Sequence, residues 1–155
     1  MRAIDVMERC RDREKEIRKL EEAIWALEKS IASCGGALGQ MGRGTPGDRY
    51  AAYVARKDEM ERELKLLRRK WAAEQVSVIL LTDRLPAARR DALRLHYCRG
   101  RNADQIAIRI NYSTRHVERI LQECREDFSL ISGPQVEGTL PNWYLNMARK
   151  EGWAE

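Results

Sequence analysis

Apolar residues recur along the first part of the chain at the spacing of a long helix that buries one stripe. One seam position holds Ala3, Cys10, Ile17, Ile24 and Ile31, and the other holds Val6, Arg13, Leu20, Leu27 and Cys34. Because steps of three and four residues keep side chains on one helical face, this pattern predicts a helix across residues 3–34, with Arg13 as its polar exception.

A glycine-rich segment separates this helix from the next one. Six of the ten glycines of the chain fall within residues 35–47, where a helix loses its stability. Thr45 then offers an N-cap, Pro46 suits the first helical position, and Asp48 places a negative charge near the positive end of the helix dipole. We therefore predict a turn at 35–47 and a second helix that begins at its end.

The second helix carries a matching seam. Its two positions hold Tyr50, Leu64, Trp71, Val78 and Leu85, and Tyr53, Met60, Leu67 and Leu81, with Lys57 and Glu74 as polar exceptions. We predict that residues 1–85 form an antiparallel, coiled-coil-like helical hairpin. The same seams would also serve to pair two copies of the chain, so a homodimer through the hairpin stays open.

Pro86 ends the second helix, because its ring and its missing N–H interrupt helical hydrogen bonding. The next helical stretch covers residues 87–99 and stops at Gly100. Its candidates for the inward face are Ala92 or Leu93, Leu95 or His96, and Tyr97.

Capping signals predict two further short helices. A variant of the capping box in residues 102–105 starts a helix over 103–110, and Asn111 tolerates the left-handed conformation that a tight turn requires. Ser113 then caps a helix over 114–128. The inward faces of the two helices hold Ile106, Ala107 and Ile110, and Val117, Ile120, Leu121 and Cys124. Two short helices therefore meet at a three-residue turn.

Composition and charge favour an all-α protein with an anionic partner. Charged residues make up 34% and aromatic residues 6% of the chain, which favours long solvated helices over a sandwich or barrel. The net charge is +5, and residues 86–125 carry nine arginines against four acidic side chains, whereas residues 126–155 have a net charge of −3. Because arginine suits phosphate and guanine contacts, we predict that a helix-turn-helix module over 86–128 binds double-stranded DNA.

The last helix of such a module lies in the major groove, and its outward side chains reach the base edges. We expect base contacts from Thr114, Arg115, Glu118, Arg119 and Gln122, with the two arginines reading guanine. We expect phosphate contacts, which fix register without reading sequence, from Arg89, Arg90, Arg101, Arg109 and Ser113.

Residues 85–128 also resemble a known family. The resemblance rests on R-x-x-L-x-L-x-Y in Arg90 to Tyr97, on Gly100, on Gln105-Ile106-Ala107, and on Tyr112-Ser113-x-Arg115-x-Val117-x-Arg119-Ile120. This stretch is similar to the promoter-binding region 4 of bacterial sigma factors and, more closely, to phage late-gene transcription regulators of the RinA and ArpU kind. The charged hairpin with its Pro-Gly turn is similar too, so the resemblance covers most of residues 15–128 and leaves out the tail.

The resemblance implies binding to a promoter or operator, control of phage late genes, and contact with RNA polymerase in the cytoplasm of a bacterial host. It also places Thr114, Arg115 and Arg119 on base-reading positions. The sequence departs from the sigma pattern there, because sigma factors have an acidic residue at the position of Arg115 and a glutamine at that of Arg119. The familiar −35 element is therefore not the expected target.

Other classes of function find little support. The chain has no apolar run long enough to span a membrane and no secretory signal at its charged amino terminus, so we expect no membrane contact and a cytoplasmic protein. The scattered Cys10, Cys34, Cys98 and Cys124 lack metal-ligand spacing, which predicts reduced structural cysteines without metal or cofactor. No Gly-rich phosphate loop or nucleophile with its base is recognisable, so we expect no catalytic residues and no enzyme activity.

Two alternatives to a transcription regulator stay open. A small terminase subunit also binds DNA through a helix-turn-helix, recognises a packaging site and assembles as a ring. A helical adaptor would instead hold RNA polymerase or another host protein with the hairpin and the tail. The tail, residues 129–155, predicts a short helix over 141–150, and its aromatic residues Trp143, Tyr144 and Trp153 either pack on the body or dock a partner.

Overall fold

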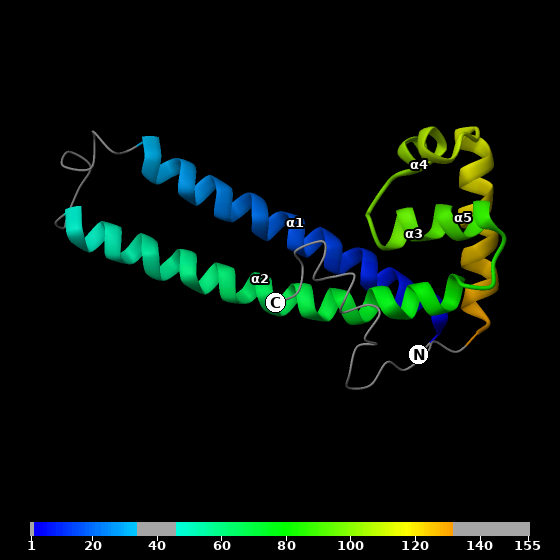
Figure 1. The fold of residues 1–155 in the computed structure, drawn as a ribbon, viewed down its shortest axis with the longest axis horizontal. Coiled ribbons are helices and arrows are strands. Elements are labelled where there is room, and N and C mark those ends of the chain that lie inside the picture. The colour runs from blue at the N-terminus through cyan, green and yellow to red at the C-terminus, as the bar shows by residue number, and fades with distance from the viewer. Residues whose placement is uncertain (1, 34–45, 132–155) are drawn as a thin grey trace. The chain divides into compact units, whose positions relative to one another are not determined.

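The structure is a computed structural model that describes residues 2–33 and 46–131. Within these ranges it contains no strand and five α-helices, which are α1 (Ala3–Ser33), α2 (Pro46–Thr82), α3 (Ala87–Tyr97), α4 (Ala103–Ile110) and α5 (Thr114–Ser129) (Figure 1). The all-α prediction is thereby confirmed. The predictions for Cys34, for Thr45 and for residues 132–155, including the helix over 141–150, lie outside the described residues.

The chain divides into two compact units by its internal contacts. The five-helix unit, in its described part, consists of residues 2–15 and 69–131, and the two-helix unit consists of residues 16–33 and 46–68. The start of α1 and the end of α2 thus belong with α3, α4 and α5 rather than with the rest of the hairpin. The sequence suggests a boundary at residue 85, whereas α2 ends at Thr82 and the contacts divide the chain inside α1 and α2.

The two-helix unit is built on the seams that the sequence predicts. Between residues 16 and 32 the side chains that are buried or half-buried all lie on the predicted stripe. They are Ile17, Leu20, Ile24, Leu27 and Ile31. Lys57 Nζ lies 2.9 Å from Glu28 Oε1, and Arg68 Nη2 lies 2.7 Å from Glu21 Oε1. These ion pairs join the later part of one helix to the earlier part of the other, so the two segments run antiparallel. Lys57, a polar exception of the second seam, has an acidic partner on α1.

The predicted seam is wrong at Tyr50. This side chain is 61% exposed, and the half-covered position in that turn belongs to Arg49. A straight α-helix has 3.6 residues per turn, so a strict seven-residue repeat drifts around it by about 20° per heptad. Near the start of α2 this drift is enough to exchange one position for its neighbour.

The core of the five-helix unit draws on all five helices. Its buried members include Ala3, Ile4, Met7 and Cys10 from α1, Val78 from α2, Ala92, Leu93 and Tyr97 from α3, Ile106 and Ala107 from α4, and Val117, Ile120, Cys124 and Phe128 from α5. Full burial of a large apolar side chain stabilises a fold by about 1.5–3 kcal/mol. The inward faces predicted for α3, α4 and α5 are confirmed, with Leu95, Ile110 and Leu121 only partly buried.

The polar exceptions of the two seams pair with each other inside the five-helix unit. Arg13 Nη2 lies 3.4 Å from Glu74 Oε1, and the two side chains are only 20% and 14% exposed. A charge that is removed from water needs a partner of opposite sign. Two residues that each interrupt an apolar seam therefore compensate one another.

Helix ends in the five-helix unit follow their local capping chemistry. The Gln105 backbone N–H donates to Asn102 Oδ1 at 2.9 Å, and the Asn102 backbone N–H donates to Gln105 Oε1 at 3.1 Å, which completes the predicted capping box. Asn111 ends α4 with a φ of 61°, in the left-handed region that asparagine tolerates. The Ser113 hydroxyl accepts the His116 backbone N–H at 3.2 Å and so caps α5. These three predictions are confirmed.

The described cysteines Cys10, Cys98 and Cys124 are buried and form no disulfide. A hydrogen bond with the Cys98 thiol, followed by burial, raises the pKa of Cys10. Burial also raises the pKa of Cys124. The thiols of Cys10 and Cys124 therefore stay protonated, and all three cysteines serve as small apolar side chains of the core.

Candidate nucleic-acid interface

Helix α5 presents a polar stripe on the side opposite to its buried face. Val117, Ile120 and Cys124 are buried in the core. The exposed side chains at helical spacing include Arg115, Glu118, Arg119 and Gln122, which we call the α5 stripe. Four of the five residues predicted to contact bases thus lie together on one exposed surface.

The fifth predicted base contact, Thr114, is only half-exposed. Its hydroxyl donates to Asp104 Oδ1 at 3.0 Å, from the first residue of α5 to the first turn of α4. This bond, together with the Tyr112 backbone N–H donating to the Ala107 carbonyl at 3.1 Å, fixes the turn between the two helices. Thr114 therefore helps to set the angle at which α5 leaves α4.

Arg119 lies at the centre of a chain of polar contacts. Its Nη2 is 2.9 Å from Nδ1 of His116, and its Nε is 3.9 Å from Oε1 of Glu123. Glu123 in turn binds Nη2 of Arg89, on α3, through Oε2 at 2.7 Å. We call these four residues the Arg119 cluster. It connects a predicted base contact with a predicted phosphate contact.

We predicted no contact to DNA for His116 or Glu123 from the sequence. Both stand at helical neighbour spacing from Arg119, three residues before it and four residues after it. Side chains at these spacings lie next to each other on a helix, so the spacing was the available signal. That Arg89 joins from another helix could not be read from the spacing.

The other members of the stripe differ in how strongly they are engaged. Within the described residues Arg115 has no hydrogen bond or ion pair, and its side chain lies in solvent. Gln122 Nε2 donates to Glu126 Oε1 at 2.8 Å, one turn further along α5. Arg115 is thus free to reorient, whereas Gln122 and Arg119 are already held by neighbours.

The predicted phosphate contacts do not gather on one surface. Arg89 and Arg90 are half-buried on α3, and Arg90 lies 3.6 Å from Asp91. Ser113 is exposed at the start of α5, and its hydroxyl already accepts the capping bond. Arg101 and Arg109 are exposed in the turn before α4 and on α4 itself.

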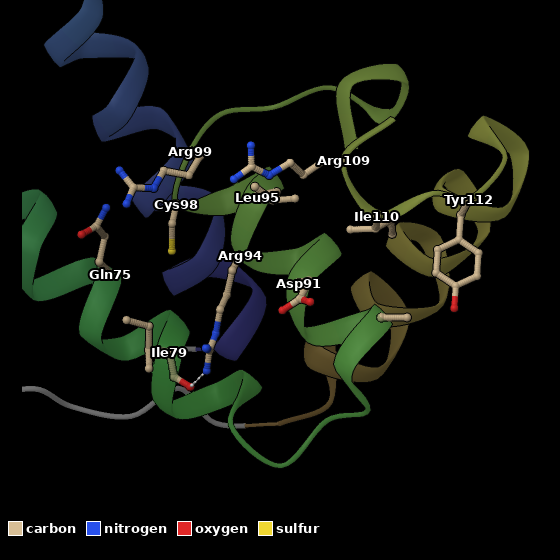
Figure 2. A pocket seen from close by; sticks show the side chains of 11 residues that line it. Gln75, Ile79, Asp91, Arg94, Leu95, Cys98, Arg99, Arg109, Ile110 and Tyr112 are labelled. Atoms are coloured by element: carbon tan, nitrogen blue, oxygen red, sulfur yellow. Dashed lines mark hydrogen bonds between the residues drawn. The ribbon is translucent and has the colours of Figure 1, made fainter. Parts of the chain in front are cut away.

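A cleft of about 600 Å³ lies between the end of α2, α3 and α4 (Figure 2). Its lining includes Ile79, Leu95, Ile110, Arg94, Arg99 and Arg109. Arg94 belongs to the wall, because its Nε donates to the Thr82 hydroxyl at 3.0 Å and its Nη2 to the Ile79 carbonyl at 3.3 Å. Figure 2 shows Arg109 extending from α4 toward Leu95 on α3.

A shallower hollow shares part of this lining. It is bounded by Leu95, Arg99, Arg101, Gln105, Ile108 and Arg109. Among the described residues no side chain of α5 lines either the hollow or the cleft. Arg101 and Arg109 therefore line a hollow together with Leu95 and Arg99, and the members of the α5 stripe do not line it.

His96 is the buried titratable group of this region. It is 6% exposed, and its Nδ1 lies 3.0 Å from the Arg101 carbonyl oxygen. Burial, with a smaller contribution from the positive charge of Arg11, lowers the pKa of His96 to about 4. The imidazole is therefore neutral at pH 7 and donates from Nδ1 to the carbonyl, which holds the turn before α4.

No protein-family model matches the chain, and comparisons with curated proteins and with solved structures find no significant match. None of the helices in the described ranges is both long enough and apolar enough to span a membrane.

Proposed function

We propose that the chain is a transcription regulator that binds double-stranded DNA and reads the major groove with α5. The observation that carries this proposal is the α5 stripe, which is exposed and polar on a helix whose other face is buried against α4. A helix with its side chains is about 10–12 Å across, and the major groove is about 12 Å wide. A helix that is anchored along one face and polar along the other fits this groove.

The residue types on the stripe match the donors and acceptors of base edges. An arginine gives two parallel hydrogen bonds to O6 and N7 of guanine, so Arg115 and Arg119 are assigned to guanines. A glutamine suits adenine and a glutamate suits the N4 amino group of cytosine, which assigns Gln122 and Glu118. Thr114 stands at the first position of α5, where it is nearest to the groove entrance.

Phosphate contacts hold the helix in register. Ser113 at the start of α5 and Arg101 before the start of α4 occupy the ends that a duplex backbone meets in helix-turn-helix complexes. Arg89 and Arg90 on α3 add positive charge near α5. Arg109 is exposed near the end of α4, and it contributes to the long-range attraction of the duplex.

The resemblance of residues 85–128 to sigma region 4 and to phage late-gene regulators supports a biological setting for this activity. On that basis we propose a phage or prophage protein that acts on late promoters in the bacterial cytoplasm. RNA polymerase is then a partner, and the basic cleft of α3 and α4 offers a surface for it that α5 does not occupy.

Selection from a pool of random duplexes, followed by binding measurements across a salt series, tests the proposal. We expect one preferred sequence for the wild-type protein. Each guanine contact that is lost in Arg115→Ala or Arg119→Ala should reduce the preference by about 5- to 150-fold, which corresponds to about 1–3 kcal/mol. The matched control is Arg56→Ala, which removes one exposed arginine from the two-helix unit.

Three outcomes would favour other functions. Equal loss in the control and in the stripe variants would mean that only net charge matters. Specific binding by a ring-forming assembly would favour a small terminase subunit over a regulator. Absence of DNA binding even at about 50 mM salt, where electrostatic affinity is high, would favour a helical adaptor.

A further inference from the structure

The side chain of Arg119 is held from two sides before any ligand is present. His116 Nδ1 accepts from Nη2 at 2.9 Å, and Glu123 Oε1 lies 3.9 Å from Nε. Glu123 is itself fixed by the 2.7 Å pair with Arg89 of α3. Arg115, one turn earlier on the same stripe, has no such contacts among the described residues.

These contacts leave the far end of the guanidinium available. An arginine has five N–H groups in a rigid plane, and a guanine needs two of them. The ion pair with Glu123 is at Nε and the hydrogen bond to His116 is at Nη2, and within the described residues no hydrogen bond or ion pair engages Nη1. Nη1 and Nη2 together are the end-on pair that meets O6 and N7.

We propose that His116 is a positioning residue that makes Arg119 the principal reader of a guanine in the target. This inference rests on the proposed DNA binding. It adds that the base pair read by Arg119 carries most of the specificity. His116 itself touches no base. It acts by holding Arg119 in the conformation that the base pair requires, so that little side-chain freedom is lost on binding.

The contact specifies the state of the imidazole. Nδ1 accepts a hydrogen bond only when it carries no proton, which places the single ring proton on Nε2. Tyr112 sets the ring orientation from the turn, since the two ring centroids are 4.9 Å apart. The charged groups of the cluster are Arg119, Glu123 and Arg89.

The test uses two variants of His116 in the full chain. His116→Ala removes the acceptor, and His116→Asn offers the side-chain oxygen as an acceptor in its place. The position read by Arg119 is found first, as the base pair whose preference disappears in Arg119→Ala. Discrimination between guanine and adenine at that position is then measured for the wild type and both variants.

We expect His116→Ala to lower this discrimination by about 3- to 10-fold, on the scale of ordering one arginine side chain. His116→Asn should restore most of it. NMR spectra of the free protein should show a slow-exchanging Arg119 guanidinium signal that is lost in His116→Ala and regained in His116→Asn. Glu126→Gln, which changes only the neighbouring contact with Gln122, is the control.

Unchanged discrimination in His116→Ala, or an equal loss in His116→Ala and His116→Asn, would overturn this inference while leaving DNA reading by α5 intact. Absence of any preferred sequence in the wild type would instead overturn the proposed function, and the inference with it. Circular dichroism of each variant separates either result from a loss of folding.

Discussion

Residues of the same type have different roles in this structure because their burial and hydrogen-bond partners differ. Two histidines show this contrast. His96 is buried, bonds to a backbone carbonyl and is kept neutral, whereas His116 is half-exposed and accepts from a charged arginine. One histidine holds the turn before α4, and the other contacts the proposed reading side chain.

The lowered pKa of His96 makes stability depend on pH. Its pKa in the folded chain, about 4, lies below the ordinary value of 6.5, so the unfolded chain binds the proton more readily. The contribution to stability is therefore complete above pH 6.5 and decreases as the pH falls toward 4. Between pH 7.5 and pH 5 the free energy of unfolding should drop by about 2 kcal/mol on account of this residue.

Urea unfolding at both pH values, compared with His96→Asn, measures this effect. Asparagine keeps an N–H donor for the Arg101 carbonyl but does not titrate. The pH-dependent loss should therefore be smaller in the variant by about 2 kcal/mol. Parallel losses in both proteins would assign the pH dependence to other groups.

At the scale of single helices, local chemistry decides where α4 and α5 begin. The reciprocal bonds between Asn102 and Gln105 start α4, and the Ser113 hydroxyl starts α5. Each cap satisfies backbone N–H groups that have no partner within the first turn of a helix. The short α4 depends on its cap most, because eight residues are too few for a stable isolated helix.

Loss of the α4 cap should therefore destabilise the chain measurably. We expect Asn102→Ala to lower the free energy of unfolding by about 1–2 kcal/mol. The Gln105 backbone N–H loses its bond to Asn102 Oδ1, and the reciprocal bond from the Asn102 backbone N–H to Gln105 Oε1 loses its support. Asn102→Asp keeps an acceptor at the same place and should lose less than half as much. Thermal unfolding followed by circular dichroism provides the measurement, and equal loss in the two variants would argue against the cap as the cause.

At the scale of the whole molecule, residues far apart in the sequence complete one core. The Ala3 backbone N–H donates to the Ile131 carbonyl at 2.7 Å, which ties the start of α1 to the segment after α5. Met7 and Cys10 from α1 are buried with Val78 from α2 and Leu93 from α3. The proposed DNA-binding helices thus depend on both ends of the hairpin sequence for their stability.

The Arg13–Glu74 pair tests this dependence. Arg13→Leu leaves Glu74 in a largely covered position without that partner, and we expect a loss of about 2 kcal/mol in the free energy of unfolding. Changing both residues to leucine should recover that loss, because both lie at seam positions where apolar side chains pack. A double-mutant cycle by urea unfolding gives the coupling, and additive effects of the two substitutions would show that the pair is not coupled.

The sequence by itself determined the helices of the described ranges, their caps, the inward faces and the α5 stripe. All of these depend on spacing within one helix or on neighbours three or four residues away, so a local pattern contains the information. Tyr50 shows the limit of such local patterns, because the small difference between a seven-residue repeat and the period of a straight helix accumulates over several turns.

Only the tertiary structure decided which distant residues meet. It joined Arg89 to Glu123 and so to Arg119, paired Arg13 with Glu74, and placed Arg101 and Arg109 on a hollow that α5 does not line. It also assigned the first turns of α1 and the last turns of α2 to the core of α3, α4 and α5. Such contacts depend on how helices pack against each other, and the packing of a buried core is set by the shapes of many side chains together, which no single stretch of sequence contains.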